Sequence, residues 1–101
     1  MSGQMCGGLG EKKQATAETQ KLIDSVRSAA ETKAGQTFEK YEAISFKSQV
    51  VAGTNYFVKV DVGCDKYVHL RVYQPLPHTG QPAELSGIQL NKTADDEIEY
   101  F

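Results

Sequence analysis

The apolar positions in the first third of the chain repeat with the period of a helix. From Thr16 onward, apolar or small side chains recur every three or four residues, and charged or polar side chains lie between them. The repeating positions are Thr19, Leu22, Ile23, Val26 and Ala30. Thr16 is a good N-cap and Gly35 a good C-cap. The pattern therefore predicts one amphipathic helix between these caps, packed on a flat surface.

After residue 37 the apolar period changes to two, which is typical of β-strands. We expect strands at residues 38–48, 54–62, 68–73 and 83–90. In the first strand, Ala43 and Ile44 are apolar neighbours, which indicates a β-bulge or bend. Glycine or proline marks the loop between each pair of strands. A helix followed by strands in chain order predicts an α+β fold, with one N-terminal helix on a curved antiparallel meander sheet.

Residues 1–14 have no periodic apolar pattern and contain four glycines, which favours a mobile tail that can still add a further edge strand. Three apolar residues, Met5, Cys6 and Leu9, surround the Gly7-Gly8 pair within it. The predicted organisation is therefore an N-terminal segment, residues 1–14, and a single domain, residues 15–101.

The composition and net charge of the chain limit the classes of function that we expect. The chain has 101 residues, of which 40% are hydrophobic, and this suits one globular domain. A net charge of −2 gives no electrostatic reason to expect a nucleic acid or an anionic membrane as partner. The sequence contains neither a membrane-spanning run nor a signal peptide pattern. Two cysteines fit a reducing compartment, so we expect a cytoplasmic protein.

Signals of catalysis are weak. The nucleophile and base candidates are Cys6 or Cys64 with His69 or His78, and no known sequence signature links them. Their spacing also lacks the close ligand pairs of a structural zinc site. We therefore expect neither an enzyme nor a protein with a metal site or a cofactor.

The segment between the first two strands, Gln49–Gly53, is unusual for a turn. Turns commonly carry polar residues that satisfy their own backbone, whereas this one carries Val50, Val51 and Ala52. An apolar hairpin tip is a candidate contact surface for a partner. The alternative is that Val50 and Val51 end a strand and stay in the core.

Topology brings a second loop beside this tip. In a meander, the connection at Gln49–Gly53 and the connection at Leu76–His78 are alternate ones, so both emerge at the same edge of the sheet. The N-terminal segment precedes the helix and can reach the same edge. Three segments with apolar or rigid tips would then form a wedge that suits a narrow apolar cleft.

Four segments carry a resemblance to a known family. Gln49–Gly53 followed by Thr54–Val60 resembles the first inhibitory hairpin of the cystatins. Met5–Leu9, Leu76–His78 and Asp95–Phe101 resemble the N-terminal trunk, second loop and C-terminal end of the stefins, which are intracellular cystatins without disulfides. Secreted cystatins usually carry Pro-Trp in the second loop, where this chain has Pro77-His78.

The resemblance implies reversible, tight inhibition of papain-like cysteine proteases of the cathepsin B, L and H type, by a cytoplasmic and also nuclear protein. It implies that Gly7 passes the catalytic cysteine of the protease, where a side chain would clash. The remaining implied protease-binding residues are Met5, Cys6, Gly8, Gln49, Val50, Val51, Ala52, Gly53, Leu76, Pro77 and His78. Within this set, the resemblance implies that Gln49 and Gly53 hold the turn. Ser2, Gly3 and Gln4 lengthen the trunk relative to typical stefins.

Two alternatives to an inhibitor remain at this point. The wedge can bind something other than a protease, because a fold does not fix a function. The monomer is the expected state, but Gln49–Gly53, as a hinge between two long strands, can also support a domain-swapped dimer.

Overall fold

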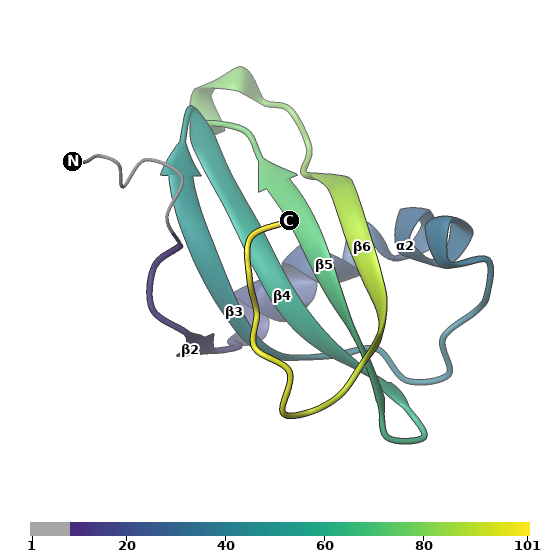
Figure 1. The fold of residues 1–101 in the computed structure, drawn as a ribbon. Helices are drawn as coiled ribbons and strands as arrows, with labels where there is room; N and C mark the ends of the chain where they lie inside the picture. The colour runs from purple at the N-terminus through teal and green to yellow at the C-terminus, as the bar shows by residue number, and fades with distance from the viewer. Residues whose placement is uncertain (1–8) are drawn as a thin grey trace.

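The computed structural model describes residues 9–101, and Figure 1 shows the helices behind an antiparallel sheet. The elements in chain order are β2 (Lys13–Gln14), α1 (Ala17–Asp24), α2 (Arg27–Ala34), β3 (Glu42–Val51), β4 (Gly53–Gly63), β5 (Lys66–Gln74), the short 3-10 helix η1 (Pro77–Thr79) and β6 (Glu84–Lys92). Within the described residues the strands form one sheet in the order β2-β3-β4-β5-β6. The predicted α+β meander is confirmed, and so is the edge strand from the N-terminal segment.

The predicted helix is divided in two. Both of its caps are confirmed: the Thr16 hydroxyl accepts a hydrogen bond from the Thr19 amide, and Gly35 ends α2 at φ +71°. Between them, the Ser25 hydroxyl donates to the Leu22 carbonyl over 2.6 Å, and the Val26 amide bonds three residues back to Ile23. A serine that bonds to a preceding carbonyl competes with the helical ladder and can bend a helix. The apolar period continues through this break, so periodicity alone could not reveal it.

The first long strand begins later than predicted. Phe38 is buried and lies outside β3 because its backbone groups are already used by the helix. The Phe38 amide donates to Glu31 Oε2 over 2.9 Å, and the Phe38 carbonyl accepts from Arg27 Nη2 over 2.5 Å. The predicted bulge is confirmed, because the register between β3 and β4 shifts between Ala43 and Ser45.

One face of the sheet packs against the helices and holds the main core. Its buried side chains are Ile23, Val26, Ala30, Phe38, Tyr41, Val58, Val60, Val68, Leu70 and Val72. The alternating apolar positions of β4 and β5 thus all point to the helices, as the period-two pattern predicted.

The opposite face is covered as well, by the segment that follows β6. Figure 1 shows this segment, drawn in yellow, crossing the sheet on the side away from the helices. Lys59 Nζ donates to the carbonyls of Ala94 and Asp96, each over 2.6 Å. Ile98 is 1% exposed, and the ring of Phe57 packs against those of Tyr100 and Phe101 at centroid distances of 5.6 and 5.7 Å. Lys59 and Phe57 of β4 therefore lie under a second layer of chain.

Candidate functional site

The tip of the β3–β4 hairpin is much tighter than predicted. Val51 and Gly53 are register partners, so Ala52 alone lies between the strands. Gly53 has φ +115°, a backbone conformation that L side chains rarely adopt. The predicted loop Gln49–Gly53 is therefore wrong in its bounds, because β3 continues through Gln49 and Val50 to Val51.

The apolar side chains of the tip point to solvent. Val50 is 81% exposed and Val51 is 46% exposed. The interpretation that they end a strand is correct, but the interpretation that they stay in the core is wrong. Large apolar groups on a narrow projecting hairpin form a small exposed apolar patch, and such patches commonly mark contact surfaces.

Two buried amides hold the strands together below the tip. Gln49 and Asn55 are register partners, each 8% exposed. Asn55 Nδ2 donates to Gln49 Oε1 over 3.0 Å. Gln49 therefore lies beneath the exposed tip and supports the turn, which is the role that the sequence resemblance implies for it.

Strand β5 contacts the tip from the side. The Tyr73 hydroxyl donates a hydrogen bond to the Ala52 carbonyl. A Cβ added to Gly53 would lie 2.6 Å from the Gln74 carbonyl oxygen and 2.9 Å from the Tyr73 hydroxyl oxygen. Glycine at position 53 thus satisfies two requirements, a positive φ and a close approach to β5.

The second loop carries the 3-10 helix η1. Leu76 is 39% exposed, and both Pro77 and His78 are exposed. The turn is closed on itself, because the Thr79 amide and hydroxyl both donate to the Leu76 carbonyl, over 3.1 and 2.8 Å. Pro77 fixes its own φ, so this loop is short and internally braced.

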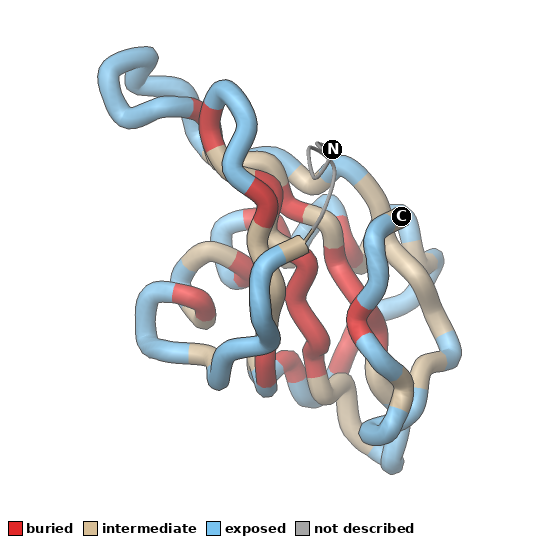
Figure 2. Tube along the Cα trace, turned by 60° about the vertical axis from the view of Figure 1, so that its left-hand side comes forward, coloured by how far each residue is buried: buried red, intermediate tan, exposed pale blue. Residues whose placement is uncertain are grey.

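Both loops project from the same end of the molecule. Figure 1 shows the β3–β4 tip and η1 together at the upper end of the sheet, and Figure 2 shows exposed chain at that projecting end, with buried strand segments below it. The predicted pairing of alternate connections at one edge is therefore what the fold produces. The short β4–β5 turn at Cys64-Asp65 lies at the other end.

The N-terminal part of the candidate site lies outside the described residues. This applies to Met5, Cys6, Gly7 and Gly8. The described part that follows runs along β3: the Gly10 amide donates to the Ser48 carbonyl over 2.9 Å, and Lys13 pairs with Phe46. The chain at Gly10 thus lies two residues below Val50.

Among the described residues, the groups considered for catalysis, Cys64, His69 and His78, are not assembled into a site. His69 is fully buried under the C-terminal segment, and its ring nitrogens form no hydrogen bond with the described residues. Burial lowers the pKa of His69 to about 4, with further lowering by Lys59 and Lys92. Cys64 is exposed in the opposite turn. Among residues 9–101, no three His, Cys, Asp or Glu side chains are grouped so that they could hold a metal ion.

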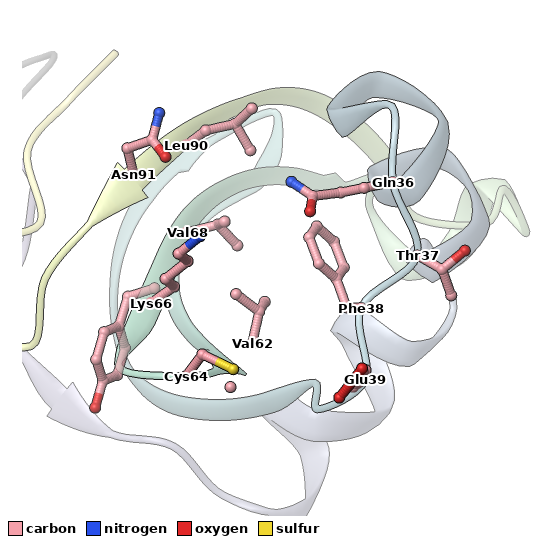
Figure 3. A pocket seen from close by; sticks show the side chains of 12 residues that line it. Gln36, Thr37, Phe38, Glu39, Val62, Cys64, Lys66, Val68, Leu90 and Asn91 are labelled. Carbon is pink, nitrogen blue, oxygen red and sulfur yellow. The ribbon is translucent and has the colours of Figure 1, made fainter.

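A cavity of about 200 Å³ opens near the turn at Cys64. Figure 3 shows Phe38, Val62 and Val68 pointing into it, with Cys64 at its rim. It lies at the end of the sheet opposite the two exposed loops.

In the described part of the chain, no helix is long and apolar enough to cross a membrane.

Comparison with known proteins agrees with this geometry. Residues 7–95 match the family model of the cystatin domain. The chain is 57% identical to cystatin-B of Mus musculus and 55% identical to cystatin-B of Homo sapiens, in each case over 96% of this chain and 99% of the relative. It is 50% identical to cystatin-A1 of Sus scrofa, over 96% of this chain and 94% of the relative.

These matches span nearly the whole chain, so the resemblance seen in four short segments extends to the entire domain. They favour an inhibitor over an enzyme and over a non-inhibitory interaction module. The chain belongs to the cystatin family, and within it to the stefins, as a cysteine protease inhibitor.

Proposed function

We propose that the end of the sheet formed by the β3–β4 tip, the η1 loop and the N-terminal segment enters the active-site cleft of papain-like cysteine proteases and blocks it reversibly. The observation that carries this proposal is the exposure of Val50 and Val51 on a one-residue turn beside Leu76 and Pro77. Proteases of the cathepsin B, L and H type are the proposed partners. The predicted cytoplasmic and nuclear location stays a prediction.

The two loops suit this task because they are already ordered. The turn at Ala52 is fixed by strand pairing on both sides, and η1 by its own hydrogen bonds. Ordering flexible loops during binding would cost free energy, and preformed loops avoid that cost. Nanomolar affinity corresponds to about −12 kcal/mol, which complexes of standard interface size, about 1,600 Å² in total, commonly reach.

The same geometry explains why the inhibitor would not be cleaved. The backbone of Val50–Gly53 is held in a closed hairpin with its neighbours in β-pairing. The loops would therefore cover the cleft with backbone that is closed into a paired hairpin, so that no peptide bond is presented to the catalytic cysteine in the geometry for attack. Met5, Cys6, Gly7 and Gly8 are proposed to fill the remaining side of the cleft, with Gly7 passing closest to that cysteine.

The experiment is a titration of active papain with the protein, read by hydrolysis of a fluorogenic peptide. Stoichiometric loss of activity at nanomolar protein is the expected result. Val51→Asp should weaken inhibition strongly, because a carboxylate must lose its water on entering an apolar cleft. Cys64→Asp is the matched control, since it adds the same charge at the tip of the opposite turn and should leave inhibition unchanged.

The N-terminal contribution needs its own variant. Gly7→Arg should weaken inhibition severely, whereas Gly3→Arg, outside the proposed contact residues, should not. Equal inhibition by both variants would remove Gly7 from the mechanism. Full papain activity at micromolar protein, with the protein folded and monomeric, would overturn the proposed function and favour a non-inhibitory binding module. A dimer in size-exclusion chromatography would point to domain swapping.

A further inference from the structure

A side chain of β5 contacts the β3–β4 tip, and no pattern in the sequence indicates this contact. Tyr73 lies near the end of β5, on the face away from the helices, and pairs in register with Asn55. Its hydroxyl crosses the top of β4 and donates a hydrogen bond to the Ala52 carbonyl. Ala52 is the only residue between β3 and β4, so this bond holds the outermost peptide of the turn.

We propose that Tyr73 is a positioning residue for inhibition: its hydroxyl holds the Ala52 carbonyl and so presents the tip in its binding conformation. This inference rests on the proposed function. In this proposal Tyr73 acts through Ala52 and Gly53. It does not contact the reacting atoms of the protease.

The packing around Gly53 supports this role. The Tyr73 ring lies directly over Gly53, so that a Cβ at position 53 would be 3.0 Å from Tyr73 Cε1. The ring therefore limits the movement of the turn toward β5, while the hydroxyl limits its movement away. Val50 and Val51 are largely exposed and cannot anchor the tip themselves.

A second consequence concerns the Ala52 carbonyl. When the tip enters an apolar cleft, water is stripped from its backbone, and an unpaired carbonyl there would cost binding free energy. The Tyr73 hydroxyl satisfies this carbonyl within the inhibitor. Binding then does not require a donor from the protease at this position.

The variant that isolates the bond is Tyr73→Phe, because it removes the hydroxyl and keeps the ring over Gly53. Tyr67→Phe is the matched control: Tyr67 lies on the same face of the same strand, at the other end, and its hydroxyl forms no hydrogen bond with the described residues. Inhibition constants for papain, melting temperatures and backbone ¹⁵N relaxation of residues 51–53 are measured for both variants and for the unmodified protein.

We expect Tyr73→Phe to raise the inhibition constant about tenfold, the effect of losing one hydrogen bond of about 1.4 kcal/mol. Its melting temperature should stay close to that of Tyr67→Phe, because the bond is solvent-exposed and far from the core. The relaxation data should show larger motion confined to residues 51–53. Tyr73→Ala, which also removes the ring, should weaken inhibition further.

Equal inhibition constants for Tyr73→Phe and Tyr67→Phe would overturn the inference. A raised constant with unchanged relaxation at residues 51–53 would also overturn it, because the hydroxyl would then act by touching the protease directly. If the unmodified protein itself fails to inhibit papain, the proposed function fails, and the role of Tyr73 in inhibition fails with it. The unmodified protein is measured first. Failure of the proposed function is therefore distinguishable from failure of the role proposed for Tyr73.

Discussion

Gln49 and Asn55 face each other across β3 and β4, and Asn55 Nδ2 donates to Gln49 Oε1 over 3.0 Å. Both residues are 8% exposed, so this amide pair is buried directly below the exposed tip. A buried polar pair of this kind ties the two strands in one register, because a slip by one residue would leave both amides unpaired.

This pair gives a prediction about stability. Asn55→Ala should lower the free energy of unfolding by about 1–3 kcal/mol, because Gln49 is left buried without its partner. Urea denaturation measures the loss. The double variant Gln49→Ala/Asn55→Ala should lose less than the sum of the two single variants. Strict additivity would show that the two amides do not stabilise the hairpin through each other.

A second prediction concerns Gly53. Gly53→Ala should destabilise the protein by about 1–3 kcal/mol, because a Cβ there meets the Gln74 carbonyl oxygen at 2.6 Å and the φ of +115° is strained for alanine. Gly35→Ala is the control: its φ is also positive, at +71°, but no atom lies within 4 Å of the added Cβ.

The two glycine variants should differ most in inhibition. Gly53→Ala should raise the inhibition constant for papain by well over tenfold, because the tip must shift, whereas Gly35→Ala should cost only about 1 kcal/mol of stability and leave inhibition unchanged. Similar inhibition by both would show that the exact shape of the tip is unimportant for binding.

A third prediction concerns Lys59, which ties the C-terminal segment to the sheet. Lys59→Met removes the donor for the carbonyls of Ala94 and Asp96 and should lower stability by about 1–3 kcal/mol. Amide hydrogen exchange in residues 93–101 should become faster than in β4 and β5. Lys66→Met, on an exposed lysine at the start of β5, should change neither quantity.

A fourth prediction concerns pH. Burial lowers the pKa of His69 to about 4 from its usual 6.5, while Lys59 and Lys92 lower it further and Asp96 opposes them. Between pH 6.5 and 4 the unfolded chain therefore binds the proton more readily than the folded protein does. Stability should fall as the pH drops through this range, by up to roughly 3 kcal/mol.

Urea denaturation at pH 7 and at pH 4.5 tests this expectation. His69→Leu should reduce the difference in unfolding free energy between the two pH values, whereas His78→Gln, on an exposed histidine, should leave it in place. An unchanged difference in His69→Leu would assign the acid sensitivity to other groups. The outcome also tests whether the C-terminal segment remains over His69 in solution.

Much of the fold could be predicted from local patterns. Thr16 and Gly35 mark the helix ends because capping depends on one or two residues, and the pair Ala43-Ile44 reveals the bulge because it breaks a period of two. The start of β3 was missed because the backbone of Phe38 bonds to Glu31 and Arg27, which are side chains of another element. Such competition leaves no mark on hydrophobic periodicity.

Part of the candidate site could likewise be predicted from the sequence, and part could not. Val50, Val51 and Leu76 could be found from the sequence because apolar residues in a turn are unusual, and alternate connections of a meander meet at one edge. Tyr73 was missed, although its position on the face away from the helices was apparent. Its contact with Ala52 depends on the stagger between β4 and β5, which the sequence does not specify. Phe57 was a signal overlooked: a large aromatic side chain facing away from the helices implies that something covers that face.

The sequence by itself determined the order of the elements, the caps, the bulge and the family to which the chain belongs, because each follows from residues close together along the chain. Only the tertiary structure decided that the first turn consists of Ala52 alone, that Gln49 is buried beneath it and that Tyr73 holds it from β5. It also decided that the C-terminal segment covers Lys59 and His69. These features depend on register and on contacts between distant segments, and a chain acquires them only when the whole sheet is packed.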